Sequence, residues 1–177
     1  MNAQRDGDVD GSRLPSVKSL QIVQTKLSQN NMDELCEWIE EMRHSFESND
    51  HSYDWFTRNP DRLPLRHEIR HAVETASAYT ADHIWMQCYN YLDVMHIHNH
   101  SNEVTDRSGI LFLDNIGQTS FLVDKGFDRA PVKHIASYPG KLVTFPPSVY
   151  HYVMSHNEPD SFRHTIAFNT VRRNGND

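Results

Sequence analysis

The apolar residues of this chain change their spacing near residue 84, and this change most constrains the fold. Over residues 31–47 and again over residues 64–82, apolar side chains recur three and four positions apart, which is typical of amphipathic helices. From Ile84 onward, short aromatic and β-branched runs alternate with turn signals such as Lys-Gly and Pro-Gly. The sequence therefore predicts two helices followed by a β-structure.

Local signals set the expected starts of the two helices. Asn31 and Glu34 resemble a capping box at the start of the first helix, and Pro64 suits the first turn of the second. The apolar stripe of the first helix contains Leu35, Trp38, Ile39, Met42 and Phe46, and that of the second contains Leu65, Ile69, Ala72, Val73, Ala76 and Tyr79.

The β-region, about residues 84–172, is expected to form a jelly-roll barrel. Short antiparallel strands close into such a barrel and leave room for a small site at its mouth. We therefore predict a mainly β fold with N-terminal helices, in which residues 16–177 form one domain and residues 1–15 form a flexible tail. The expected strands are Ile84–Leu92, Asp93–His98, Ile110–Leu113, Ser120–Val123, Val132–Ser137, Leu142–Phe145, His151–Ser155 and His164–Val171.

The composition disfavours several classes of partner. The chain has 17 Lys+Arg against 24 Asp+Glu, a formal charge of −7, which disfavours a nucleic-acid partner. Its apolar runs are too short to cross a membrane, and the N-terminus lacks the apolar stretch of a signal peptide. We expect a cytoplasmic protein whose two cysteines, Cys36 and Cys88, stay reduced, and we leave open a homodimer.

Histidine is frequent, with 12 in 177 residues, and its densest run spans residues 96–100. Side chains two positions apart share a face of a strand, so at least two imidazoles from this run, such as those of His98 and His100, can converge inside a barrel. Imidazole is the commonest metal ligand in proteins. His151, at the start of a later strand, can add a third ligand, and three protein ligands leave positions open, as in non-haem iron sites.

The last expected strand carries a candidate anion site. Arg163 and Thr165 alternate there with His164, so they face the barrel interior if His164 packs outward against the helices. A buried arginine needs a counter-charge. A guanidinium grips a ligand carboxylate through two bonds, and a hydroxyl two residues away can add another. An ion pair with Glu158 or Asp160 is the alternative reading.

These motifs together resemble the Fe(II)- and 2-oxoglutarate-dependent oxygenases, in particular the small prolyl-hydroxylase-like group, over roughly residues 85–171. That group has a His-x-Asp pair followed by an arginine, then a Gly-x-Leu-x-x-Phe-Pro stretch that runs into a distal histidine, then an Arg-x-Ser/Thr pair. The residues that resemble these three motifs here are His98, His100 and Arg107, then Gly140 to His151, then Arg163 and Thr165.

The resemblance implies a double-stranded β-helix, the cupin-like form of the jelly roll. It also implies Fe(II) held by His98, His100 and His151, and 2-oxoglutarate whose far carboxylate is held by Arg163 and Thr165. The implied activity is oxidation of a substrate, usually hydroxylation, with release of succinate and CO2. We expect a small molecule or a short peptide as substrate, with Trp85, Tyr89, Tyr91, Tyr150 and Tyr152 as candidates for the pocket wall.

The chain departs from the family pattern at His100, where the family usually has Asp or Glu. Three neutral imidazoles leave a metal with one more unit of positive charge than two imidazoles and a carboxylate do. Glu103 or Asp106 in the following polar turn, or His96, could replace His100 as a ligand.

Aligned differently, the same region resembles a cupin that does not use 2-oxoglutarate, either a metal-dependent dioxygenase or an isomerase. Its first motif would be His96, His98, Glu103 and Gly109, and its second Gly140, Pro146 and His151. Arg163 and Thr165 favour the oxygenase, because a cupin enzyme does not need them. A barrel that binds a metal or an anion without catalysis is a third possibility.

Overall fold

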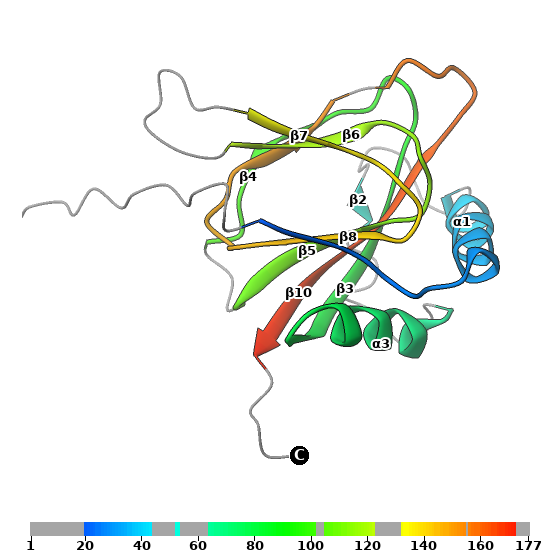
Figure 1. Cartoon of the computed structure of the whole chain (residues 1–177). Coiled ribbons are helices and arrows are strands. Elements are labelled where there is room, and N and C mark those ends of the chain that lie inside the picture. The colour runs from blue at the N-terminus through cyan, green and yellow to red at the C-terminus, as the bar shows by residue number, and fades with distance from the viewer. Residues whose placement is uncertain are drawn as a thin grey trace, which may run out of the picture.

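The computed structural model describes residues 20–43, 52–53, 64–101, 105–122, 132–154 and 156–172. Two antiparallel sheets face each other, and two helices lie outside the larger sheet (Figure 1). This arrangement confirms the predicted fold class, a mainly β barrel with N-terminal helices. The predicted tail, residues 1–15, lies outside the described residues.

The larger sheet has six strands in the order β1-β8-β5-β10-β3-β2, and the smaller has four in the order β4-β9-β6-β7. Each predicted strand corresponds to one of β3 to β10, whereas β1 and β2 were not predicted. The strands of the larger sheet are β1 (Gln21–Gln24), β2 (Ser52–Tyr53), β3 (Tyr79–Tyr89), β5 (Arg107–Phe112), β8 (Lys141–Phe145) and β10 (Arg163–Arg172). Those of the smaller sheet are β4 (Met95–His98), β6 (Gln118–Leu122), β7 (Val132–Ala136) and β9 (His151–Val153).

The first helix, α1 (Gln29–Arg43), starts earlier than the capping-box pattern predicted. The Ser28 hydroxyl accepts a hydrogen bond from the Asn31 backbone N–H at 3.2 Å, so Ser28 rather than Asn31 caps the first turn. Leu35 and Ile39 of the predicted stripe are buried, while Phe46 lies outside the described residues.

The second helix, α3 (Arg66–Ala76), is shorter than predicted. Ser77 has an extended backbone, and its hydroxyl donates to the Val73 carbonyl at 2.8 Å, which ends the helix. Tyr79, placed by its spacing on the helical stripe, is instead the first residue of β3. The helical prediction was wrong here because β3 pairs with β10 over its whole length, a long-range pairing that local spacing does not reveal.

Two apolar clusters hold these layers together. One lies between the helices and the outer face of the larger sheet and contains Leu35, Ile39, Ile69, Val73, Ile84, Met86, Ile166 and Phe168 among others. The other lies between the two sheets and contains Ile110, Phe112, Phe121, Ile135, Val143, Phe145 and Val149. None of the helices in the described part of the chain has the length and apolar character that crossing a membrane requires.

Close packing of β5 against β10 depends on one glycine. A Cβ atom at Gly109 would lie 2.2 Å from Cζ of Phe168, which is fully buried in the outer cluster. The glycine therefore lets this ring cross the neighbouring strand. With Ile166 and Phe168 facing the helices, the alternate residues of β10 face the barrel interior, as predicted.

Candidate metal centre and active-site cavity

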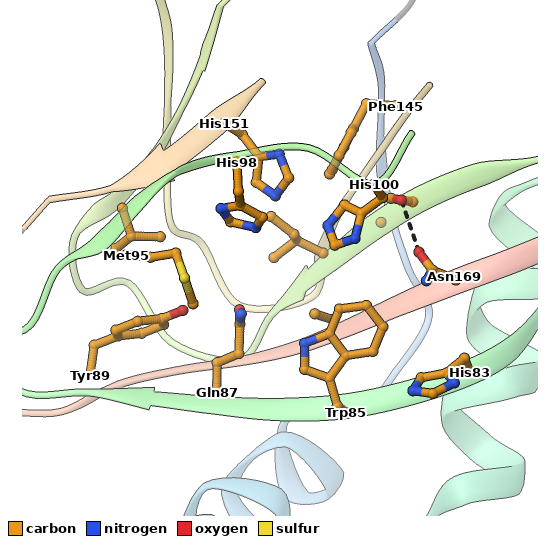
Figure 2. A pocket seen from close by; sticks show the side chains of 15 residues that line it. His83, Trp85, Gln87, Tyr89, Met95, His98, His100, Phe145, His151 and Asn169 are labelled. Carbon is orange, nitrogen blue, oxygen red and sulfur yellow. Dashed lines mark hydrogen bonds between the residues drawn. The ribbon is translucent and has the colours of Figure 1, made fainter. Parts of the chain in front are cut away.

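The three predicted histidines come together at one point of the barrel wall. His98 ends β4 and pairs directly with His151, which begins β9. His100 lies two residues beyond β4, and its backbone N–H donates to the Pro147 carbonyl at 2.8 Å, which holds it beside the start of β9. One ring nitrogen from each of the three lies within 4.8 Å of the other two. Figure 2 shows these imidazoles on one side of a cavity and β3 side chains on the other.

Backbone carbonyls orient two of these rings. The Nδ1 atom of His98 lies 2.8 Å from the His96 carbonyl, and that of His151 lies 3.1 Å from the Val149 carbonyl. A carbonyl oxygen only accepts, so each Nδ1 carries the proton and each Nε2 keeps its lone pair. This second interaction of a ligating imidazole is typical of metal sites.

Burial keeps His151 neutral. The pKa of His151 is lowered from 6.5 to about 3, chiefly because burial removes solvent; the nearby His98 and His100 also lower it, and the hydrogen bond to the Val149 carbonyl opposes these effects. The rings of Phe145 and Phe121, at 4.8 and 5.9 Å between centroids, cover it on the barrel side. A neutral imidazole is the form that binds a metal, so His151 can act as a ligand at neutral pH without first losing a proton.

The cluster fits a metal ion once the three rings turn toward one centre. Metal–nitrogen bonds of about 2.0–2.1 Å, at angles of about 90–110° for three ligands on one face, place two ligand atoms about 3.0–3.4 Å apart. The ligand atoms now lie within 4.8 Å of one another, so the widest separation would shorten by up to about 1.8 Å. His96 and Asp106 are exposed and lie outside this cluster, and Glu103 lies outside the described residues.

A cavity of about 340 Å³ extends between this cluster and the β3–β10 pair (Figure 2). The predicted wall residues Trp85 and Tyr89 line it, whereas Tyr91 is exposed in the turn after β3. Tyr150 and Tyr152 do not line it. The lining residues are His83, Trp85, Gln87, Tyr89, Met95, His98, His100, Ser108, Gly109, Ile110, Phe145, His151, Val153, Ala167 and Asn169.

Arg163 lies at one end of the barrel interior, only 1% exposed. Its Nη2 donates to the Thr119 hydroxyl at 2.7 Å and its Nε to the Ser137 hydroxyl at 3.3 Å. Its third nitrogen, Nη1, has no hydrogen-bond partner within the described part of the chain. Burial lowers the pKa of Arg163, but an arginine side chain remains protonated in proteins.

Tyr89 presents a second buried donor beside this guanidinium. The Arg163 Cζ atom lies 5.3 Å from the centre of the Tyr89 ring, and the Tyr89 hydroxyl also has no partner among the described residues. Burial raises the pKa of Tyr89, so the hydroxyl keeps its proton. Within the described part of the chain, Arg163 Nη1 and the Tyr89 hydroxyl are therefore two buried donors without an acceptor.

The alternative ion pair of Arg163 with Glu158 or Asp160 does not form, since within the described residues its hydrogen bonds go to hydroxyls alone. Thr165 faces inward as predicted, but its hydroxyl donates to Gln87 Oε1 at 2.9 Å, and Gln87 rather than Thr165 lines the cavity. A direct role of Thr165 in binding a carboxylate remains a prediction.

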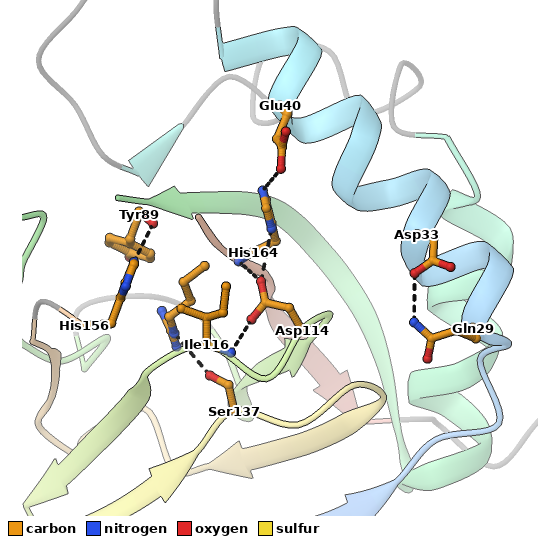
Figure 3. A network of polar contacts seen from close by, with 10 residues as sticks. Gln29, Asp33, Glu40, Tyr89, Asp114, Ile116, Ser137, His156 and His164 are labelled. Atoms are coloured by element: carbon orange, nitrogen blue, oxygen red, sulfur yellow. Dashed lines mark hydrogen bonds and ion pairs between the residues drawn. The ribbon is translucent and has the colours of Figure 1, made fainter. Parts of the chain in front are cut away.

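Behind the arginine, a polar network anchors the start of β10 (Figure 3). Asp114 contacts Nδ1 of His164 at 3.0 Å and accepts the Ile116 backbone N–H at 2.9 Å. The other ring nitrogen of His164 lies 3.3 Å from Glu40 of α1. This network ties α1 and the segment after β5 to the residue next to Arg163, which restricts where the guanidinium can lie.

Among the lining residues that the sequence analysis did not assign to the cavity, four are polar: His83, Gln87, Ser108 and Asn169. Alternation of side chains on β3 could have identified His83 and Gln87, because residues 83, 85, 87 and 89 share the inner face. Asn169 follows from the same rule on β10, counting from Arg163.

Solved structures with a similar fold include oxygenases that share little sequence with the chain. A prolyl hydroxylase from Trichoplax adhaerens, in complex with a hypoxia inducible factor peptide, has a TM-score of 0.62 at 13% identity, covering 88% of this chain and 84% of that one. The chain has the fold of the Fe(II)- and 2-oxoglutarate-dependent oxygenases.

Two further structures support this oxygenase fold. A Pseudomonas putida prolyl-4-hydroxylase has a TM-score of 0.55 at 14% identity and covers 88% of both chains. HygX from Streptomyces hygroscopicus, solved with nickel and 2-oxoglutarate bound, has a TM-score of 0.56 at 8% identity, covering 88% of this chain and 83% of that one. No protein-family model and no curated protein matches the sequence. At these identities the likeness is one of fold.

Proposed function

We propose that the protein is a non-haem Fe(II)- and 2-oxoglutarate-dependent dioxygenase. The observation that carries this proposal is the presence, in one barrel, of a three-histidine cluster and a buried guanidinium whose Nη1 has no hydrogen-bond partner among the described residues. 2-Oxoglutarate has a keto acid at one end, which can chelate a metal, and a carboxylate at the other. The two features match these two ends.

The buried donors support binding of the far carboxylate. An unsatisfied buried donor costs about 1–3 kcal/mol, and a buried charge without a counter-ion costs more. A carboxylate placed between Arg163 Nη1 and the Tyr89 hydroxyl would accept from both and neutralise the charge. Tyr89 is therefore added to the predicted cofactor-binding residues, Arg163 and Thr165.

The histidine cluster supports binding of the metal. His98, His100 and His151 would hold Fe(II), which when bound would supply the electrons and open coordination positions for reaction with dioxygen. The overall reaction is substrate plus dioxygen plus 2-oxoglutarate to hydroxylated substrate, succinate and CO2. The protein's own part is to orient the imidazoles through the backbone carbonyls of residues 96 and 149, and to exclude water with Phe145 and Phe121.

The size of the cavity supports a small substrate. Ligand pockets usually measure about 300–1,000 Å³, and this one, about 340 Å³, has to admit both 2-oxoglutarate and the reacting part of the substrate. We therefore propose a small molecule or a short peptide that inserts one side group.

An anaerobic titration of the Fe(II)-loaded protein with 2-oxoglutarate tests the proposal. Chelation of iron by a keto acid produces a weak visible charge-transfer band, which should appear in the wild-type protein and be absent at the same concentrations in Arg163→Met. Iron binding without any band would refute the use of 2-oxoglutarate and favour a cupin-type metal enzyme or a non-catalytic metal-binding barrel. Formation of succinate in air provides a second readout.

A further inference from the structure

The cavity has two chemically different ends. Along the β3–β10 pair, Tyr89 is opposite Arg163 and His83 is opposite Asn169. These two positions are six residues apart on β3, which corresponds to about 20 Å along a strand. Figure 2 shows Tyr89 and Met95 at one end of the cavity and His83 and Asn169 at the other. A molecule of 2-oxoglutarate held at the arginine end leaves the second end for another ligand.

A buried amide at the second end has a defined orientation. The Ser108 hydroxyl donates to Asn169 Oδ1 at 2.8 Å, and the two residues are only 1% and 7% exposed. Because the amide oxygen of Asn169 accepts from Ser108, the part of this side chain that can donate to a ligand is its amino group. An amide amino group has two N–H donors, and Asn169 lines the cavity. This end can therefore donate to an acceptor on a ligand.

An aromatic plane lies beside this amide. The Trp85 indole lines the cavity between His83, which it meets edge-on at 5.4 Å, and the candidate metal ligand His100, at 6.0 Å between ring centres. A flat group placed against the indole would thus lie next to the metal position. Aromatic rings favour such offset or edge contacts with other planar groups.

The second end also lacks formal charge. Among the described residues that line the cavity there is no Asp, Glu, Lys or Arg, and His83 is the titratable group at this end besides His100. A charged group transferred from water to this position would lose its hydration without gaining a counter-ion from the lining side chains. The lining therefore disfavours an ammonium group, and it offers a carboxylate no partner of its own, so a carboxylate would be drawn to the metal position and away from Asn169.

We propose that the end formed by His83, Trp85, Ser108 and Asn169 binds the primary substrate, and that the substrate enters with an uncharged planar group that carries a hydrogen-bond acceptor. An aromatic or cyclic amide has this chemistry. The planar group lies against Trp85, and its carbonyl oxygen accepts an N–H from Asn169. This inference rests on the proposed function, which assigns the other end to 2-oxoglutarate.

Three probes that share one ring and differ in charge test the inference: benzamide, benzoate and benzylamine. Their binding to the full chain, loaded with Zn(II) and 2-oxoglutarate, is measured by saturation-transfer NMR. We expect benzamide to bind at least about tenfold more tightly than either charged probe. Trp85→Leu and Asn169→Asp should each weaken benzamide about tenfold, while Trp85→Phe keeps a planar ring and most of the affinity.

Gln118→Glu is the matched control, since it makes the same amide-to-acid change on β6, away from the lining residues, and should leave benzamide binding unchanged. Equal or tighter binding of benzoate or benzylamine, no binding of benzamide, or unchanged affinity in Trp85→Leu and Asn169→Asp would each overturn the inference. Titration of 2-oxoglutarate in the same samples separates the two hypotheses. If it binds while benzamide is not preferred, only the substrate inference fails; if it does not bind, the proposed function fails.

Discussion

Replacing Arg163 with Met should remove 2-oxoglutarate binding without unfolding the barrel. Methionine is about as long as the arginine side chain up to Nε, so it fills the buried space that the aliphatic stem of Arg163 occupies. The change removes the hydrogen bonds to Thr119 and Ser137. It also removes a charge that is 1% exposed and whose Nη1 has no partner in the described structure.

The loss of the two hydrogen bonds lowers stability and the loss of the buried charge raises it, by similar amounts. Two hydrogen bonds from a charged donor contribute roughly 3–6 kcal/mol, at about 1.5–3 kcal/mol each. Burial of an ion costs several kcal/mol after relaxation of the protein. We therefore expect the free energy of unfolding, without 2-oxoglutarate, to change by less than about 2 kcal/mol, or less than about 4–8 °C in Tm for a chain of this size.

The stabilisation by 2-oxoglutarate should differ much more between the wild type and Arg163→Met than the stability of the two free proteins does. A ligand at one hundred times its Kd stabilises the folded protein by about 2.7 kcal/mol, which corresponds to a rise in Tm of roughly 5–11 °C. Anaerobic thermal denaturation of the metal-loaded proteins over a range of 2-oxoglutarate concentrations should show this rise in the wild type and none in Arg163→Met.

Arg70→Met provides the control for this experiment. Arg70 lies on α3 outside the barrel, where its Nε donates to the Ala81 carbonyl, so its loss should leave the rise in Tm intact. A full rise in Arg163→Met would refute the assignment of Arg163 to the carboxylate. A loss of much more than 2 kcal/mol without ligand would show that the arginine has a structural role in the free protein.

Four further predictions concern the metal site and the core. His151→Ala should abolish metal binding, as measured by elemental analysis after dialysis with Fe(II), and full metal content would contradict the cluster as a site. In the metal-free protein, the pKa of His151 is about 3 in the folded state against an ordinary 6.5, so between these values the unfolded chain binds the extra proton. The free energy of unfolding should therefore fall by about 1.4 kcal/mol per pH unit as pH drops below 6.5. In His151→Gln, unfolding free energies measured by urea denaturation at several pH values should fall less steeply with decreasing pH. Gly109→Ala should cost about 1–3 kcal/mol by overpacking against Phe168, and the double variant with Phe168→Leu should recover part of this in urea denaturation. Asp114→Ala should cost about 2–3 kcal/mol through its lost contacts with His164 and Ile116, with thermal denaturation as the check.

The strands could be predicted from the sequence because their signals are local. Alternation of apolar residues, interrupted by turn residues, located β3 to β10 to within a few residues except at the start of β3. That start was lost in the helical pattern of residues 64–82, because only the pairing of Tyr79 and Thr80 with β10 makes them a strand. β1 and β2 are short edge segments of the larger sheet, and their strand conformation depends on partners distant in sequence.

The histidines and the arginine could be predicted for a related reason. His98, His100 and His151 have side chains that bind metals, and their spacing on strands lets these side chains converge in a barrel. In the structure, one ring nitrogen of each lies within 4.8 Å of the other two. Alternation on β10 predicted that Arg163 faces inward if His164 packs outward against the helices, and His164 does so, since it contacts Glu40 of α1. The sequence could not show that, among the described residues, the hydrogen bonds of this arginine go to hydroxyls alone and that Tyr89 lies beside it, because those contacts join strands that are far apart along the chain.

The sequence alone determined the spacing of apolar residues in most segments, which residues of a strand share a face, and the residue types available to bind a metal and an anion. These are local properties, set by side-chain chemistry and by the geometry of helix and strand. The tertiary structure alone decided which inward residues meet. It placed Ser108 against Asn169, Thr165 against Gln87 and the Tyr89 ring beside Arg163. Such pairings depend on sheet order and register, which are set by the packing of the whole barrel and not by any one segment.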